Sequence, residues 1–273
     1  VNTEAVDVPT EMSVLTIAEL HDAGYNVLTW DPRGFGQSTG TVTVDSPDFE
    51  AKDVSVLMDW VATLDGVLLD ADGDPRVGMV GASYGGGIQF VTAATDCRVD
   101  AITPTIAWNS LGTSLYKADT VKSGWADILV SISGDHDLDE HILSADEAGR
   151  TTGLLSDEDR TWFLERGPAD IVGDITIPTL IVQGTVDGLF TLDEAVRNHQ
   201  TIIKTGVPVS MLWYCGGHGA CLTDPGPPDR VRDAILAWLD RYVMQNDDAP
   251  MVASFQTVDQ NGEVHDYPVY PPS

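Results

Sequence analysis

The sequence predicts an α/β fold in which a mostly parallel β-sheet is flanked by helices. Short β-branched runs alternate with segments of helical periodicity along most of the 273 residues, which is typical of parallel strands joined by crossover helices. A strand, a glycine-rich turn and a helix follow one another near residue 83, as at the centre of such a sheet. The hydrophobic content of 42% is enough for a sizeable core.

The first part of the chain carries clear helix and strand signals. Residues 11–23 have apolar side chains at helical spacing and stop at Gly24, so a helix is expected there. The apolar run 25–30 predicts a buried strand. A helix is expected over 46–64, because Pro47 stands in what would be its first turn. The remaining elements expected here are a strand over 76–80, a helix over 84–94 and a strand over 99–106.

The pattern changes between residues 108 and 171, where polar helical stretches follow one another with no strand between them. This segment is too long for a simple connection, so we expect an inserted helical lid. Alternation then resumes, with strands expected over 178–183 and 207–214 and helices over 192–204 and 229–244. Residues 252–270 alternate like a single strand with a turn at Asn261-Gly262 and no core of their own.

The charge of the chain limits its partners. It has 43 acidic and 14 basic residues, for a net charge of -29. Such a surface repels phosphate backbones and anionic lipids, so we expect neither nucleic acid nor membrane as a partner. The acidic residues are dispersed, which favours stability that rises with salt, although an acidic composition unrelated to salt fits as well. A melting temperature that stays flat from low to molar salt would argue against salt dependence.

Three cysteines are present. Cys97 is expected to be an isolated thiol. Cys215 and Cys221 flank residues 216–220, so they either close a short disulfide loop, which would favour a secreted protein, or remain two small buried thiols, which we slightly favour. No second Cys or His pair stands at ligand spacing, so neither a metal nor another cofactor is expected.

The most informative motif is Gly81-Ala82-Ser83-Tyr84-Gly85. Between a strand and a helix, a G-x-S-x-G serine is held in a sharp, exposed turn where its hydroxyl can act as a nucleophile. The alternative is a glycine-rich turn whose serine only caps the helix. The N–H of Tyr84, directly after the serine, would be one donor to an oxyanion.

A serine nucleophile needs a base and a carboxylate that orients the base. Asp187 follows the strand predicted at 178–183, and His218 follows the one predicted at 207–214. Alone, the aspartate fits a turn and the histidine a satisfied polar group. In the order Ser83, Asp187, His218, each after a predicted strand, they are typical of a catalytic triad. Trp108 and Asn109 follow another strand and are candidates for an acyl pocket, with ordinary packing as an equal alternative.

With these motifs, the chain resembles the X-prolyl dipeptidyl-peptidase and cocaine esterase family of acyl hydrolases over about residues 11–244. The resemblance is carried by Asp31-Pro32-Arg33-Gly34-Phe35-Gly36-Gln37-Ser38-Thr39-Gly40, by Gly81-Ala82-Ser83-Tyr84-Gly85-Gly86, by Ile177-Pro178-Thr179-Leu180 leading to Gly184 and Asp187, and by Gly217-His218.

The resemblance implies an α/β-hydrolase fold and a division of this chain. The hydrolase core would occupy residues 1–107 and 172–248, the helical lid 108–171, and a linker with the start of a C-terminal β-domain 249–273. Family members carry further strands and an oxyanion loop ahead of the first helix. We therefore expect these N-terminal strands to be missing from the chain as given.

The function expected is that of a serine hydrolase that cleaves esters, and amides as a second possibility, through an acyl-enzyme on Ser83. Its substrate would be a small-molecule ester or a short peptide. The first alternative is a peptidase resembling the X-prolyl dipeptidyl-peptidases. The second is a catalytically silent binding module on the hydrolase fold.

Overall fold

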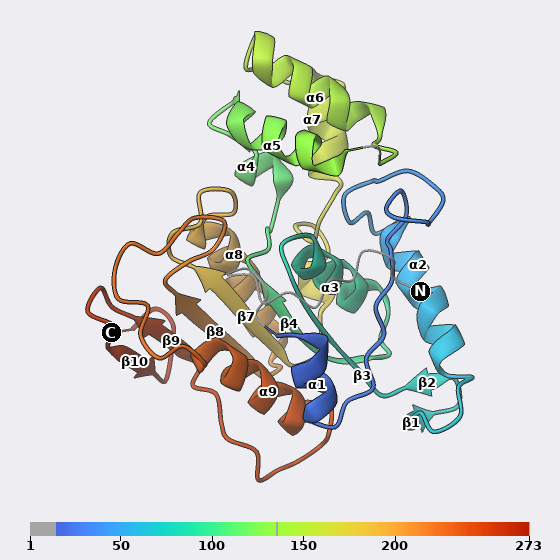
Figure 1. Cartoon of the computed structure of the whole chain (residues 1–273), viewed down its shortest axis with the longest axis vertical. Helices are drawn as coiled ribbons and strands as arrows, with labels where there is room; N and C mark the ends of the chain where they lie inside the picture. The colour runs from blue at the N-terminus through green and yellow to red at the C-terminus, as the bar shows by residue number, and fades with distance from the viewer. Residues whose placement is uncertain (1–14, 135, 273) are drawn as a thin grey trace.

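The computed structural model describes residues 15–134 and 136–272, and the chain is drawn in Figure 1. The first described helix is α1 (Ile17–Asp22). Residues 11–14 of the helix expected over 11–23 lie outside the described residues, and Leu15 and Thr16, which are described, are not helical. The Thr16 hydroxyl accepts a hydrogen bond from the N–H of Glu19, and the Glu19 carboxylate accepts one from the N–H of Thr16. This reciprocal cap sets the start of α1.

In the part of the chain that the structure describes, the centre of the fold is a six-stranded sheet in the order β10-β9-β8-β7-β4-β3. Strands β3, β4, β7, β8 and β9 run parallel, and β10 is antiparallel to β9. The predicted α/β class with a mostly parallel sheet is confirmed. The strands are β3 (Val77–Ala82), β4 (Val99–Thr105), β7 (Thr179–Gly184), β8 (Val209–Tyr214), β9 (Phe255–Val258) and β10 (Val264–Tyr267).

Helices cover both faces of the sheet, because successive strand side chains point to opposite faces. On one face, Ile181 and Met211 pack with side chains of α2 (Glu50–Val61), α3 (Tyr84–Thr95) and α8 (Leu192–Ile202). On the other face, Leu180 and Leu212 pack with Ile235, Trp238 and Leu239 of α9 (Arg230–Tyr242), and α1 lies beside α9 (Figure 1).

A helical layer lies between β4 and β7 in the sequence and above the sheet in Figure 1. It packs onto the loop after β7, where Leu189 and Phe190 join Trp108, Leu111, Trp162 and Phe163 in a separate apolar cluster. The layer contains α4 (Leu111–Ser114), β5 (Tyr116–Lys117), β6 (Thr120–Val121), α5 (Ser123–Ser133), α6 (Glu140–Thr151) and α7 (Asp157–Leu164). Three small elements lie elsewhere: the hairpin of β1 (Leu69–Ala71) and β2 (Asp74–Pro75) and the 3-10 turns Val172–Asp174 and Ile203–Thr205.

No helix in the described part of the chain is both long and apolar enough to cross a bilayer.

The pairing of β5 with β6 contradicts the expectation of no strand within residues 108–171. Three further expectations about the elements are wrong. Residues 25–30 form no strand, since no described strand pairs with that run and the side chains of Val27 and Leu28 are 36% and 40% exposed. Helix α2 begins at Glu50 rather than Ser46, because the Glu50 carboxylate accepts hydrogen bonds from the N–H groups of Thr43 and Ser46 and holds the preceding residues in a turn.

The third concerns the last residues of the chain. Instead of one strand without a core, they form two strands, and β9 pairs in parallel with β8. Phe255 is buried against Trp213 and Tyr270, with ring centroids 4.9 and 5.0 Å away. The apolar side chains of this hairpin therefore complete one face of the central sheet.

Gln89 joins the three elements that meet at the serine turn. Its Nε2 donates to the carbonyl oxygens of Gly81 (3.1 Å) and Gly85 (2.7 Å), and its Oε1 accepts from the N–H of Thr103 (2.9 Å). The side chain is fully buried, so water cannot replace these bonds. Gln89 thus holds β3, β4 and α3 together.

Replacing Gln89 with leucine is expected to lower the free energy of unfolding by about 3 kcal/mol, because buried backbone groups on three elements lose a partner. Urea denaturation followed by circular dichroism measures this. The matched control is Gln183→Leu, since Gln183 is also buried but donates a single hydrogen bond, to the carbonyl of Phe190 at 2.7 Å. Equal losses in the two variants would contradict the special role of Gln89.

Candidate active site

Ser83 lies in a sharp turn between β3 and α3. Its backbone angles are φ 55° and ψ -114°, a conformation that L-residues rarely adopt. The N–H of Ser83 donates to the carbonyl of Thr105 (2.9 Å), and its own carbonyl accepts from the N–H groups of Gly86 and Gly87 (both 2.9 Å). Backbone contacts on both sides therefore hold the residue in this strained conformation.

The glycines of the motif allow the close approach of strand and helix. A Cβ atom on Gly81 would lie 2.6 Å from the Gly85 carbonyl oxygen, and one on Gly86 would lie 2.7 Å from the Thr105 carbonyl oxygen. Both distances are shorter than real Cβ contacts, so only glycine fits either position. The predicted strand, serine turn and helix are confirmed as local structure.

The structure brings Ser83, His218 and Asp187 together in one hydrogen-bonded chain. Ser83 Oγ lies 2.8 Å from His218 Nε2, and His218 Nδ1 lies 2.7 Å from Asp187 Oδ2. The side chain of His218 is 8% exposed and that of Asp187 is fully buried. In this arrangement the imidazole can accept the proton of Oγ while the carboxylate orients the ring.

Asp187 is oriented by backbone groups as well as by the imidazole. Its Oδ1 accepts hydrogen bonds from the N–H groups of Leu189 (2.9 Å) and Phe190 (2.7 Å). Its Oδ2 accepts one from the N–H of His218 at 3.2 Å, in addition to the contact with the ring. Each oxygen therefore has a separate set of partners, and Oδ2 faces the histidine.

The loop after β8 carries His218 and contacts the Asp187 loop closely. Gly216 and Gly217 have φ angles of 150° and 117°. A Cβ atom on Gly217 would lie 2.8 Å from Asp187 Oδ2, and one on Gly219 would lie 2.1 Å from the Val186 carbonyl oxygen. The glycines flanking His218 thus let its backbone lie directly against residues 186–187.

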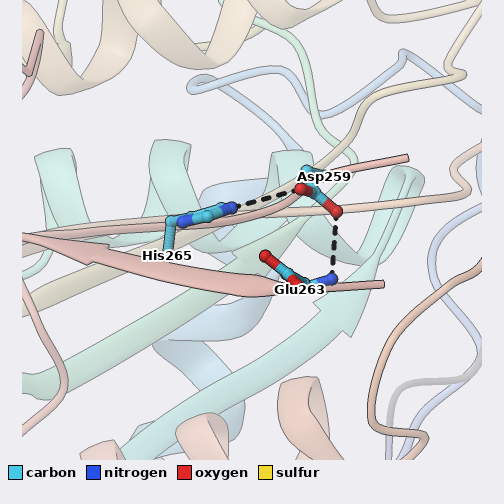
Figure 2. Close-up of side chains that lie close together, drawn as sticks. All are labelled: Asp259, Glu263 and His265. Carbon is cyan, nitrogen blue, oxygen red and sulfur yellow. Dashed lines mark hydrogen bonds and ion pairs between the residues drawn. The ribbon is translucent and has the colours of Figure 1, made fainter. Parts of the chain in front are cut away.

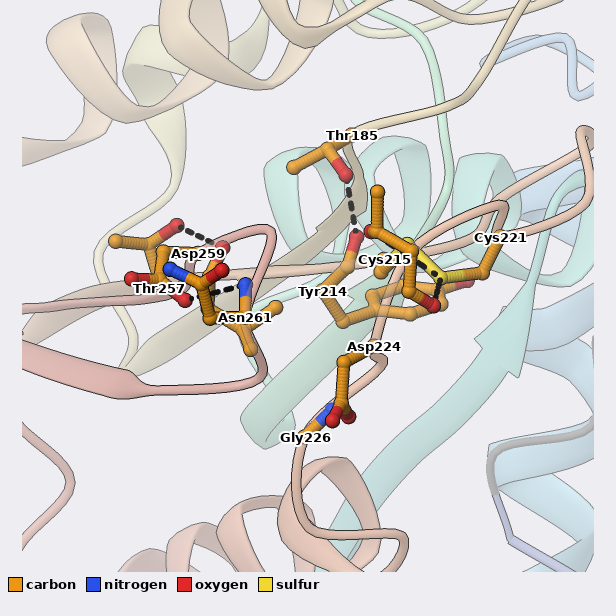
Figure 3. The surroundings of a disulfide bond; sticks show 11 residues. Thr185, Tyr214, Cys215, Cys221, Asp224, Gly226, Thr257, Asp259 and Asn261 are labelled. Carbon is orange, nitrogen blue, oxygen red and sulfur yellow. Dashed lines mark hydrogen bonds between the residues drawn. A yellow bond between two sulfur atoms is a disulfide. The ribbon is translucent and has the colours of Figure 1, made fainter.

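Cys215 and Cys221 are joined by a disulfide, with their Cα atoms 5.2 Å apart (Figure 3). The expectation of two buried thiols, which we slightly favoured, is wrong. The positive φ angles of Gly216 and Gly217 turn the chain back on itself, which brings Cys221 to the end of β8. Within the described residues, Cys97 is a free and exposed thiol, as predicted.

Aromatic rings enclose the His218 imidazole. The rings of Trp125, on α5, and Phe190 lie with centroids 5.9 and 5.3 Å from it, both nearly perpendicular to it. They limit the access of water to the ring. Sequence reasoning did not connect either residue with His218, and for Phe190 the one available signal was its position three residues after Asp187.

Tyr84 is the first residue of α3, so its N–H has no acceptor within the helix and lies at the positive end of the helix dipole. Its hydroxyl donates to Glu50 Oε1 (3.3 Å) and accepts from the N–H of Asp45 (3.4 Å). Burial, reinforced by the negative charges of Asp45 and Glu50, raises the pKa of this phenol well above its ordinary value. The side chain is therefore held away from Ser83 by residues of the loop before α2.

A cavity of about 1310 Å³ is lined by Ser83 and Tyr84 on the side of the sheet and by the helical layer on the other. Most of the side chains from the helical layer are apolar, so the space beside the serine suits an apolar group. They include Leu111, Leu115, Val121, Ala126, Leu129, Val130, Ile132, Leu138, Ile142, Leu155 and Phe163.

Trp108 and Asn109 do not line this cavity, so their expected place in an acyl pocket is wrong. Both are buried on the side of α8. The Asn109 side chain donates to Asn198 Oδ1 (2.7 Å), and its N–H donates to Glu194 Oε2 (2.9 Å). Trp108 packs on Phe190, with ring centroids 4.9 Å apart. The chain after β4 is held by these polar contacts before it enters the helical layer.

Asp45 is a fully buried carboxyl group at the edge of the cavity. Within the described residues, neither of its side-chain oxygens has a hydrogen-bond partner. Burial first, and then repulsion by Glu50, raises the pKa of Asp45 well above its ordinary value. The folded chain thus keeps this proton to a higher pH than the unfolded chain, whose aspartates titrate near pH ~3.9.

The free energy of unfolding is therefore expected to fall as the pH rises from about 4 toward the folded pKa of Asp45. Asp45→Asn removes this loss, and at pH 8 it is expected to be more stable than the wild type by about 1–3 kcal/mol. At pH 4 the difference is expected to shrink. Urea denaturation at the two pH values tests this. The control is Asp48→Asn, because the side chain of Asp48 is 81% exposed. A stability difference independent of pH would contradict the assignment.

A second cluster of polar side chains lies on the β9–β10 hairpin, at the opposite edge of the sheet from β3 (Figure 2). One potential ligand atom from each of Asp259, Glu263 and His265 lies within 4.8 Å of the others. Sequence reasoning did not single out this cluster. Such exposed groups are common without an ion, so the absence of a metal or cofactor stays a prediction.

Comparison with known proteins places the chain among hydrolases. The X-Pro dipeptidyl-peptidase (S15) family matches residues 4–219. An uncharacterised 31.7 kDa protein of Escherichia coli is 28% identical over 166 residues, which cover 60% of this chain and 56% of that protein. A Rhodopirellula baltica protein named as a candidate Xaa-Pro dipeptidyl-peptidase is 23% identical over 288 residues, covering 90% of this chain and 44% of the relative. The chain spans about half the length of these curated relatives.

A solved structure shares the fold. The CocE/NonD family hydrolase from Staphylococcus aureus superposes with a TM-score of 0.66 at 15% identity, over 88% of this chain and 41% of that one. At this identity the likeness concerns the fold, and it agrees with the parallel sheet and flanking helices described above. Because the family match extends over more than half of the sequence, from before α1 to the His218 loop, the chain belongs to the X-Pro dipeptidyl-peptidase (S15) family and has an α/β-hydrolase fold.

Proposed function

We propose that this chain is a serine hydrolase that cleaves ester bonds through an acyl-enzyme on Ser83. The observation that carries the proposal is the hydrogen-bonded chain from Ser83 Oγ through the His218 ring to Asp187 Oδ2, with contacts of 2.8 and 2.7 Å. The strained turn that presents Ser83 and the membership of the S15 family support it further.

In the proposed reaction, Ser83 Oγ attacks the carbonyl carbon of the substrate while its proton passes to His218 Nε2. The Asp187 carboxylate stabilises the imidazolium that forms. The imidazolium then donates the proton to the leaving group, and the carbon–leaving-group bond breaks. Water, deprotonated by the same nitrogen, attacks the acyl-enzyme, releases the acid and restores the Ser83 hydroxyl.

The tetrahedral intermediate carries a negative oxygen that needs donors fixed in advance. We assign one of them to the N–H of Tyr84, at the N-terminus of α3, where the helix dipole adds to the attraction. We assign no second donor within the described residues.

The cavity beside Ser83 supports the proposed substrate class. Its apolar lining from the helical layer suits an ester with an apolar acyl group or a short apolar peptide. We place esters first, because amide cleavage needs additional positioning of the leaving group. The second candidate is a dipeptidyl-peptidase activity on X-Pro substrates, which family membership and the name of the R. baltica relative favour. Turnover of X-Pro-anilides in preference to p-nitrophenyl esters would select this second activity.

We further propose that residues 108–171 act as a lid between two parts of the core, 1–107 and 172–248. The contact of Trp125 with the His218 ring supports this, because it joins the helical layer to the loop that carries the histidine. The assignment of residues 249–273 to a linker and the start of a further β-domain stays a prediction.

The direct test is covalent labelling. A fluorophosphonate probe is expected to add to the chain with a stoichiometry of one, and peptide mapping is expected to place the adduct on Ser83. Hydrolysis of p-nitrophenyl acetate is expected to show an initial burst of p-nitrophenol as the acyl-enzyme forms. A folded chain that neither labels nor hydrolyses esters and X-Pro-anilides would instead be a catalytically silent module.

A further inference from the structure

The Cys215–Cys221 disulfide encloses the residue that the proposed mechanism uses as its base. Cys215 directly follows β8, and Cys221 lies six residues later, so His218 is in the middle of the closed loop. Figure 3 shows the disulfide beside the end of β8 and near Thr185 of the neighbouring loop. The bond thus joins the chain after His218 to the end of a core strand.

The two halves of this loop are held differently. Before His218, the carbonyl of Tyr214 accepts from the N–H of Thr185 (2.8 Å), and that of Gly216 accepts from the N–H of Val186 (3.0 Å). After His218, no hydrogen bond between backbone groups of described residues involves 219–223, and Leu222 is 88% exposed. The next backbone contact along the chain is the bridge between Asp224 and Asn261, so the disulfide is the restraint closest to His218 on this side of the loop.

The position of the imidazole depends on both halves. The His218 ring must reach Ser83 Oγ and Asp187 Oδ2 at once, at 2.8 and 2.7 Å. The backbone of Gly219 lies against the Val186 carbonyl oxygen, where a Cβ atom would come within 2.1 Å. The N–H of His218 donates to Asp187 Oδ2 at 3.2 Å, and no backbone hydrogen bond of described residues holds Gly219. Release of the second half would therefore allow the contact of Gly219 with Val186 to open and the imidazole to shift.

We propose that the Cys215–Cys221 disulfide is a positioning element for His218, so that the oxidised chain is active and reduction of the bond lowers kcat. The inference rests on the proposed function and adds a dependence on redox state. The closed loop is short, and in the chain-entropy model short loops contribute least to global stability. The effect is therefore expected in catalysis more than in the free energy of unfolding.

The reductant proposed for this step is a dithiol. One thiolate of the dithiol attacks Sγ of Cys215 or Cys221, which breaks the S–S bond and forms a mixed disulfide. The second thiol of the reductant displaces the cysteine and closes a cyclic disulfide. The dithiol gives two electrons and two protons to the disulfide, so that Cys215 and Cys221 become thiols. Both cysteines are partly exposed, which allows attack from solvent.

The experiment compares the oxidised chain, the chain reduced with dithiothreitol and the Cys215→Ser/Cys221→Ser double variant, on the ester that the wild type hydrolyses. Reduction and the double substitution are each expected to lower kcat by about 100-fold, the scale of a displacement near 1 Å, and to leave KM within about twofold. Reoxidation is expected to restore kcat. Cys97→Ser, treated alike, is expected to behave as the wild type and excludes an effect of the free thiol.

A second readout does not need activity. In the oxidised chain, the His218 Nδ1–H is expected to give a downfield proton resonance through its hydrogen bond to Asp187, and reduction is expected to remove it. An unchanged resonance and an unchanged kcat after reduction would overturn the positioning role. An oxidised chain that has the resonance but neither labels nor hydrolyses would instead overturn the proposed function alone.

Discussion

Replacing Ser83 with alanine is expected to lower kcat by about 10⁶-fold and to abolish labelling by a fluorophosphonate. The substitution removes Oγ, the only atom of this residue that the mechanism uses, and it leaves the turn intact because alanine carries the same Cβ. His218 loses one hydrogen bond, of 2.8 Å, and keeps its contacts with Asp187. Stopped-flow and steady-state hydrolysis of p-nitrophenyl acetate measure the effect.

The matched control is Ser133→Ala. Ser133 also lines the cavity, and its hydroxyl donates to the carbonyl of Leu129 at 2.8 Å, within α5. This variant is expected to label and to hydrolyse esters like the wild type. Labelling that persists in Ser83→Ala would show that another residue is the nucleophile and would remove the basis of the proposed function.

Replacing Asp187 with asparagine is expected to lower kcat by about 10⁴-fold with little change in fold. Oδ1 accepts from two backbone N–H groups, so the amide oxygen of the asparagine takes that position. The amide NH₂ then takes the place of Oδ2, where it faces both the N–H and Nδ1 of His218. A donor there favours the tautomer with its proton on Nε2, and that nitrogen can no longer accept the proton of Ser83.

Asp224→Asn is the control for this substitution, since it removes the same charge from an exposed position shortly after the disulfide loop. Its kcat is expected to stay within about twofold of the wild type, because exposed charges are screened by solvent and salt. Circular dichroism and the fluorophosphonate labelling rate are measured for both variants. Equal activity of Asp187→Asn and the wild type would exclude Asp187 from the reaction.

Much of the core could be predicted because its signals are local. The β-branched run of β7 and the helical spacing of α9 each lie within one continuous stretch, and both elements formed close to where they were expected. The serine turn could also be predicted from local sequence, because the close contact that requires glycine at position 81 is with Gly85, four residues away. The prediction of a strand over residues 25–30 was wrong because an apolar run forms a strand only where another strand pairs with it.

The errors near the site share another cause. Trp108 and Asn109 follow a strand, as residues of an active site often do, but contacts with Asn198 and Phe190 bury them away from the cavity. The cysteine spacing allowed both a disulfide and free thiols, and the choice depended on the backbone turn at Gly216 and Gly217. Neither question can be answered from residue types in order along the chain.

By itself, the sequence determined the fold class, the serine turn and the order of Ser83, Asp187 and His218, because periodicity and glycine placement act over a few neighbouring residues. Only the tertiary structure decided that these three side chains meet, since Ser83 and His218 are 135 positions apart. It also decided that Trp125 and Phe190 enclose the imidazole and that a disulfide closes the loop around it. Such contacts depend on how whole strands and helices pack, and local sequence patterns do not specify that packing.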